Sequence, residues 1–172
     1  MWVTQTYMCT IESRSLLYVY YFFEDYNSSQ KRFTQRLQKE MEMIGDVYGE
    51  KVSLMFPNPR YRGKIEAEVR ELPWLWSTIN GKLPGVLIAD VPLKDLQENS
   101  KIFYICFETE EVSSVVEVIK KIRKISDEYI LDKEKINKNF IKKDFFGRLF
   151  DAIEIKPGIW GISLDIKKIL NR

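Results

Sequence analysis

The run Tyr26–Lys31, Tyr-Asn-Ser-Ser-Gln-Lys, places two adjacent hydroxyls where an apolar segment gives way to a helix-like pattern. Ser28 and Ser29 could act as nucleophiles only beside a general base. The chain has no histidine, so a Ser-His-Asp or Cys-His system, an imidazole base and a histidine-ligated zinc are excluded. Asn27 and Ser28 are preferred caps for a helix N-terminus. We therefore predict a capping role here and assign no catalytic residue, no metal ligand and no cofactor.

A second polar cluster, Arg60-Tyr61-Arg62, groups fixed positive charges around an aromatic ring, with Lys64 close behind. Guanidinium groups bind carboxylates and phosphates, and a neighbouring helix N-terminus would add backbone N–H donors. The cluster is therefore a candidate site for a small anionic ligand, and the alternative is a solvated basic loop. Carboxylates follow at positions 66, 68 and 71, and the exposed face of a helix accounts for them without catalysis.

Hydrophobic periodicity predicts the elements that position these residues. Apolar runs indicate strands at 16–23, 52–56, 86–89 and 102–107. Three helices are predicted: one that begins at Asn27 or Ser28, one at about 64–80, and one that begins at about 112. Pro73 should kink or split the second helix. Gly45 and Gly49 offer exits from the first helix. That helix should bury one stripe of residues, made of Phe33, Leu37, Met41, Ile44 and Tyr48. The last helix should bury a similar stripe, made of Val115 or Val116, Ile119, Ile122, and Ile125 or Tyr129.

The predicted order, βαβαββα, defines an α/β fold. Its first strand–helix–strand unit must be parallel and right-handed, whereas the short link at 90–100 suits an antiparallel last pair. With Leu83-Pro84 directly before the third strand, this order and the 26–31 run resemble the thioredoxin-like superfamily over about residues 16–130. A flavodoxin-like or TIR-like sheet is the rival. The absence of a helix between the last two strands favours the thioredoxin-like interpretation.

The resemblance implies where a site would lie. It would bring the start of the first helix, the loop at 57–64 and the proline loop at 82–85 to one edge of the sheet, with Pro84 in the cis form. Residues 27–30 stand where that superfamily carries its Cys-x-x-Cys pair, and both cysteines are missing. Thiol chemistry at the helix N-terminus is therefore not expected. A backbone edge beside such a proline can pair with an extended peptide.

The remaining segments are predicted to form an irregular extension at 1–15, a core domain at 16–131, and an appendage at 132–172 with a basic helix and a β-hairpin. Residues 118–172 hold 14 Lys and Arg against 8 Asp and Glu, which indicates a solvated basic face or a docking surface for an anionic partner. The apolar positions of the appendage must be buried within the chain or in a homodimer. They are Phe140, Phe145, Leu149, Trp160, Ile162 and Leu164.

Location follows from what the sequence lacks. No apolar run approaches the roughly 20 residues of a membrane span, and residues 1–10 carry no Lys or Arg for a secretory signal. Cys9 and Cys106 are far apart, and Cys106 is predicted to be a small buried residue. A cytoplasmic protein is therefore expected.

We predict a redox-inactive thioredoxin-like binding module that recognises a protein or peptide partner. Alternatives are a domain that senses a small anionic ligand or nucleotide, and a TIR-like or flavodoxin-like carboxylate-dependent enzyme. Contact of the basic appendage with a membrane surface or nucleic acid is not favoured. The predicted binding residues are Tyr26, Asn27, Ser28, Gln30, Arg60, Tyr61, Arg62 and Pro84.

Overall fold

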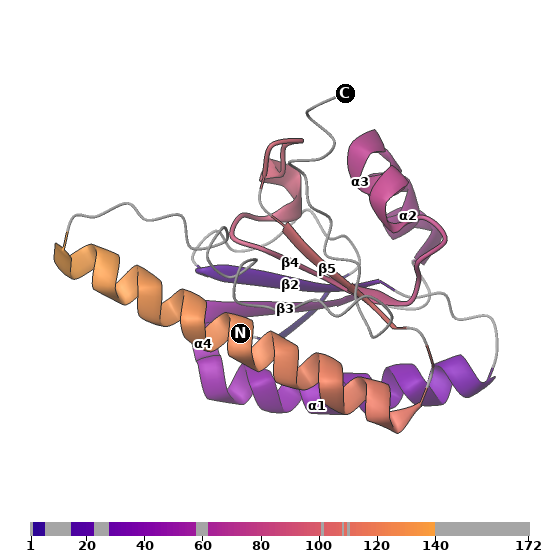
Figure 1. The fold of residues 1–172 in the computed structure, drawn as a ribbon. Helices are drawn as coiled ribbons and strands as arrows, with labels where there is room; N and C mark the ends of the chain where they lie inside the picture. The colour runs from indigo at the N-terminus through magenta and orange to yellow at the C-terminus, as the bar shows by residue number, and fades with distance from the viewer. Residues whose placement is uncertain are drawn as a thin grey trace, which may run out of the picture.

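A five-stranded mixed sheet carries helices on both of its faces (Figure 1). The computed structural model describes residues 2–5, 15–22, 28–57, 62–100, 102–107, 109 and 111–139. The chain is an α/β protein, as the sequence predicts. The strands are β1 (Trp2–Gln5), β2 (Leu17–Phe22), β3 (Val52–Pro57), β4 (Gly85–Ala89) and β5 (Ile102–Cys106). The helices are α1 (Ser28–Tyr48), α2 (Arg62–Arg70), α3 (Pro73–Ile79) and α4 (Val112–Asn139), with short 3-10 turns η1 (Gly49–Lys51) and η3 (Leu93–Asp95).

The strands lie in the order β1-β3-β2-β4-β5. β2 and β3 are parallel neighbours joined through α1, as the connection rule for such a unit requires. β1 adds to the far side of β3, also in parallel. β4 runs antiparallel to both β2 and β5. The predicted parallel first unit and antiparallel last pair are therefore both confirmed.

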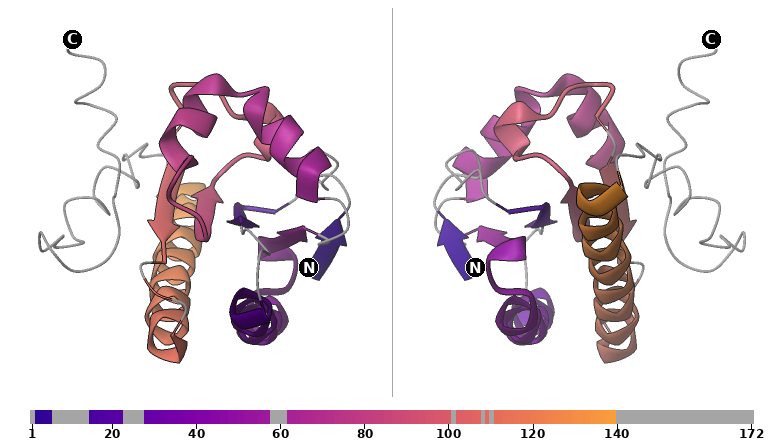
Figure 2. Two further views of the ribbon diagram at one scale, coloured as in Figure 1. Left: turned by 90° about the vertical axis from the view of Figure 1, so that its right-hand side faces the viewer. Right: turned by 90° about the vertical axis from the view of Figure 1, so that its left-hand side faces the viewer.

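Residues alternate along each strand between two cores, one on each face of the sheet. One core packs α1 and α4 against the sheet, and the other packs α2 and α3 (Figure 2). The six residues of β2 are all buried, because this central strand has helices above and below it. A continuous apolar run, rather than alternation, is the pattern that such a position demands.

The predicted stripe of α1 is confirmed, because Phe33, Leu37, Met41 and Ile44 are buried and Tyr48 packs beside them. The structure also decides the choices left open in α4. There the buried residues include Val115, Ile119, Ile122, Ile125 and Tyr129, whereas Val116 is exposed.

The chain leaves α1 at the second of the two predicted glycines, Gly49, and not at Gly45. Gly45 is a buried helical residue, and the helix ends at Tyr48. Gly49 then adopts a φ of 55°, in the left-handed region that favours glycine. The predicted break at Pro73 is confirmed, because α2 ends at Arg70 and proline opens α3. Proline is well suited to this first helical position, where its missing N–H is not needed.

Two predictions about the ends of the core are wrong. Residues 2–5 form a strand of the sheet and not an irregular extension. The segment is too short to carry a periodic signal, and pairing with β3 determines its conformation. The expected boundary between 131 and 132 falls inside α4, which is continuous to Asn139 because no Pro or Gly interrupts it. The predicted β-hairpin lies outside the described residues.

Across the described part of the chain, no helix combines the length and the apolar character that crossing a membrane requires.

Candidate functional site

All five strands have an end at one edge of the sheet, and β1 reaches it where Gln5 pairs with Pro57. β2 ends at Phe22, which pairs with Gly85 at the start of β4, and Gly85 pairs in turn with Cys106 at the end of β5. The parallel register of β2 and β3 brings the last residue of β3, Pro57, level with Phe22. The segments that lead into α1, α2 and β4 therefore all emerge here. We call this place the proline-loop edge.

The loop before β4 is held at both of its ends. The Lys82 carbonyl accepts a hydrogen bond from the Tyr104 hydroxyl at 2.9 Å, and the Pro84 carbonyl accepts one from the Phe107 N–H at 2.9 Å. The Leu83–Pro84 peptide bond is cis, which confirms the prediction for Pro84. Within the described residues, no hydrogen bond engages the N–H or the C=O of Leu83.

The first residue of β4 must be small because Tyr104 lies over it. A Cβ atom added at Gly85 would come closer than 3.0 Å to the hydroxyl oxygen and the Cζ of Tyr104. Tyr104 is only 3% exposed, so its ring is confined. This close approach keeps the hydroxyl within reach of the Lys82 carbonyl, and it thereby fixes the loop.

An aromatic cluster supports the same edge on the α1 side of the sheet. The Phe107 ring meets Phe33 of α1 edge to face, with ring centroids 4.9 Å apart. It also contacts Tyr21 of β2 at 6.2 Å, and Tyr21 packs on Phe56 of β3 at 4.9 Å. Edge-to-face and tilted pairs of this kind add stability beyond their buried area. The beginning of α1 and the end of β5 are therefore joined rigidly.

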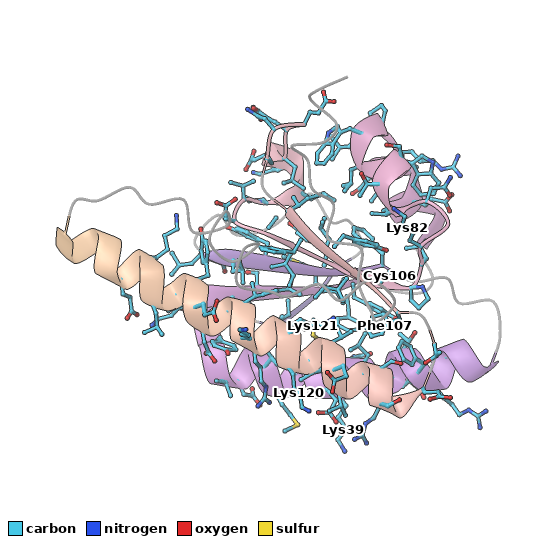
Figure 3. The ribbon with its side chains drawn as sticks, viewed as in Figure 1. Lys39, Lys82, Cys106, Phe107, Lys120 and Lys121 are labelled. Atoms are coloured by element: carbon cyan, nitrogen blue, oxygen red, sulfur yellow. The ribbon has the colours of Figure 1, made fainter. Side chains whose placement is uncertain are left out.

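Cys106 and Lys82 are part of this edge; the sequence analysis placed the loop at 82–85 here but did not place Cys106 here. Cys106 was predicted to be buried within a strand. It is instead half-buried as the last residue of β5, on the face that carries α2 and α3. Figure 3 shows Lys82, Cys106 and Phe107 at the same end of the sheet. The charged residues that follow Phe107 in the sequence are the signal that could have placed Cys106 at a strand end.

The structure places only some of the predicted binding residues. Ser28 and Gln30 lie in the first turn of α1, and Arg62 is the first residue of α2. Both helices follow strands that end at the proline-loop edge, and Pro84 lies in the loop itself. Tyr26, Asn27, Arg60 and Tyr61 are outside the described residues, as are the side chains of Ser28, Gln30 and Arg62.

The strongest electrostatic perturbation lies away from this edge, at the far end of α1. The Tyr48 hydroxyl donates to a carboxylate oxygen of Asp127 at 2.7 Å and to the Arg123 carbonyl at 3.2 Å. Burial and the hydrogen bond to Asp127 raise the pKa of Tyr48 well above its ordinary value. Tyr48 therefore stays protonated and ties α1 to α4. We therefore assign this hydrogen bond a structural role, because it joins the end of one helix to the middle of another.

The described residues hold no group of three Cys, Asp or Glu side chains arranged to bind a metal ion. Comparisons with family models, curated proteins and solved structures found no match to this chain. The candidate site therefore stands on its own geometry: an edge held by hydrogen bonds and aromatic contacts, at which the Leu83 backbone has no partner in the described part of the chain.

Proposed function

We propose that this chain is a redox-inactive binding module of the thioredoxin-like superfamily, and that its proline-loop edge binds an extended segment of a protein or peptide. Leu83 carries the proposal. Its N–H and C=O have no hydrogen-bond partner in the described part of the chain, whereas the neighbouring Lys82 and Pro84 carbonyls are both engaged. An extended backbone with open donors and acceptors is what a peptide strand pairs with.

The strand order and directions support the superfamily assignment. The parallel β2–β3 pair joined through α1 and the antiparallel β4–β5 pair agree with the element order on which the resemblance rests, and β1 is an addition that this order did not include. Asn27 and Gln30 occupy the positions of the missing cysteines. Without a thiolate at the α1 N-terminus the fold keeps a recognition edge and loses its redox chemistry.

A small anionic ligand is the second candidate. It is favoured by the position of α2, because this helix begins at Arg62 and follows a strand that ends at the same edge. Arg60 and Arg62 would then provide the charge, and the α2 N-terminus would provide N–H donors. Inorganic phosphate is the probe for this candidate, with Arg60→Glu/Arg62→Glu as the variant that should lose it.

Peptide binding is tested by selecting a displayed library of random peptides against the full chain. The synthesised peptides are then added while amide hydrogen exchange is measured. Pairing with Leu83 should slow exchange of its amide, which has no hydrogen-bond partner among the described residues. Protection that falls only on other segments, or a library that yields no binder, would refute the proposal.

Two substitutions at one position separate backbone pairing from side-chain contact. Leu83→Pro removes the N–H donor and should weaken peptide binding, whereas Leu83→Ala keeps the donor and should retain most of it. Loss of one backbone hydrogen bond costs about 0.5–1.5 kcal/mol, which is about 2- to 12-fold in Kd. Circular dichroism checks that each variant is folded. Equal binding by both variants would show that the Leu83 backbone is not used.

A further inference from the structure

Charge is segregated along α1. The exposed residues of its first half include Lys31, Arg32, Arg36 and Lys39, and no acidic residue lies among them. From position 40 to position 50 the charged residues are all acidic, namely Glu40, Glu42, Asp46 and Glu50, the last of which lies in η1. Up to Glu50, the helix and its short extension therefore present a positive half followed by a negative half, and Lys51 ends the extension in an ion pair with Glu134 at 2.8 Å.

The same order of charges recurs along α4. Residues 120–124 contain four basic side chains, and the one acidic residue before them in the helix, Glu117, forms an ion pair with Lys120 at 3.4 Å. Asp127, Glu128, Asp132 and Glu134 follow, with Lys133 among them, and Lys135 and Lys138 lie in the last turns of the helix. Between residues 120 and 134, α4 thus repeats the order of α1, positive first and negative second.

The two helices start at the same end of the molecule and cover the same face of the sheet (Figures 1 and 2). Their positive halves therefore lie toward one end of this face, and their negative halves lie toward the other. The bonds from Tyr48 to Asp127 and to the Arg123 carbonyl join the end of α1 to the middle of α4. Figure 3 shows Lys39 and Lys120 on the side of these helices that faces away from the sheet. We call this solvent-facing surface the α1/α4 face, with a basic half and an acidic half.

The α1/α4 face also carries apolar side chains. The exposed large hydrophobic residues of the described chain all lie on these two helices: Met43 (48% exposed), Val47 (69%), Val116 (40%) and Leu131 (53%). Single exposed apolar residues need no explanation, but their restriction to one layer of the molecule does. Met43, Val47 and Leu131 lie in the acidic half, and Val116 lies in the basic half.

We propose that the α1/α4 face binds a second copy of this chain in an antiparallel, two-fold symmetric dimer. A two-fold interface uses the same patch on both copies, so the patch must complement itself. Turning one copy by half a turn places its basic half on the acidic half of the other, and the reverse contact forms at the same time.

A polyanion such as nucleic acid fits the face less well. It would be attracted to Lys39, Lys120 and Lys124, but it would meet Asp46 and Glu50 farther along the same helices. A second copy of the chain places opposite charges against both halves of the face. The area of the face is also close to what a dimer needs. α1 is about 31 Å long and two adjacent helices span about 20 Å, so the face covers about 600 Å² in projection. A stable interface buries roughly 800 Å² on each partner.

The test uses two full-length charge variants. The acidic-face variant carries Lys39→Glu, Lys120→Glu and Lys124→Glu, and the basic-face variant carries Glu42→Lys, Asp46→Lys and Glu50→Lys. Sedimentation velocity at increasing protein concentration should show the wild type dimerising, with weaker association at high salt. Each variant alone should dimerise about a hundredfold more weakly, because like charges then face each other in both symmetric contacts. An equimolar mixture of the two should restore association as a heterodimer.

A matched control places the same charge change elsewhere. Glu66→Lys, Glu71→Lys and Glu98→Lys replace three negative charges by three positive ones outside the α1/α4 face, as the basic-face variant does within it, and they should leave dimerisation unchanged. A wild type that stays monomeric at every concentration would overturn the proposal, as would a mixture of the two variants that does not associate. Wild-type binding to a duplex DNA oligonucleotide that is lost in the acidic-face variant, without any dimer, would assign the face to a polyanion instead.

Discussion

Replacing Gly85 by alanine tests whether the Tyr104 contact fixes the proline loop. The new Cβ would overlap the hydroxyl oxygen and the Cζ of Tyr104, and this ring is confined at 3% exposure. Overpacking of this kind costs about 1–3 kcal/mol. Displacing the ring also breaks its 2.9 Å hydrogen bond to the Lys82 carbonyl, for a further cost of about 0.5–1.5 kcal/mol.

A smaller effect opposes these costs. Alanine restricts the unfolded chain more than glycine does, which stabilises the folded state by about 0.4–1 kcal/mol. Gly85→Ala should therefore lower the free energy of unfolding by about 1–4 kcal/mol. Urea unfolding followed by circular dichroism measures this change, and an unaltered slope would show that the fold itself is retained.

A double-mutant cycle with Tyr104→Leu isolates the contact. Leucine removes the ring atoms that the new Cβ would meet, so Gly85→Ala should be close to neutral in that background. Tyr104→Phe serves as the control for the hydroxyl, and it should cost only the hydrogen bond to Lys82, about 0.5–1.5 kcal/mol. The reasoning is refuted if Gly85→Ala costs the same with tyrosine or leucine at position 104, because the two residues would then act independently.

Three further outcomes are expected. Burial and Asp127 raise the pKa of Tyr48, so the contribution of this hydroxyl to the free energy of unfolding is complete below pH 10 and is lost as the unfolded tyrosine ionises above it. Tyr48→Phe should therefore flatten the fall in unfolding free energy above pH 10. An unchanged dependence of that free energy on pH would count against the hydrogen bond. Leu37→Ala should cost about 2–5 kcal/mol because Leu37 is fully buried, whereas Gln35→Ala on the exposed side should stay within about 0.5 kcal/mol in the same urea titration. The protein should not reduce insulin in the presence of dithiothreitol, and turnover that disappears in Cys106→Ser would show that the half-buried thiol at the proline-loop edge is a redox site.

Local signals were sufficient for the elements of the core. The stripe of α1 follows from helical spacing alone, and Pro73 separates α2 from α3 because proline removes an N–H and fixes φ. The continuous apolar run of β2 predicted a strand, and the structure shows all six of its residues buried. These predictions succeed because each depends on residues within one or two turns of each other.

Predictions failed where a distant partner determines the outcome. β1 is a strand because it pairs with β3, and four residues carry too little pattern to show this. α4 continues past residue 131, where Glu134 pairs with Lys51 at 2.8 Å. The boundary expected there had no Pro or Gly to support it.

The sequence by itself determined the α/β class, the order of the core elements, and the absence of histidine and of a Cys-x-x-Cys pair. The tertiary structure alone placed Gly85 beneath Tyr104 and Cys106 beside the proline loop, and it aligned the charges of α1 and α4 on one face. The physical reason is the separation along the chain between the residues that interact. Helical and strand periodicity is local, whereas strand register and helix packing join residues that are tens of positions apart, and only the folded chain decides which of them meet.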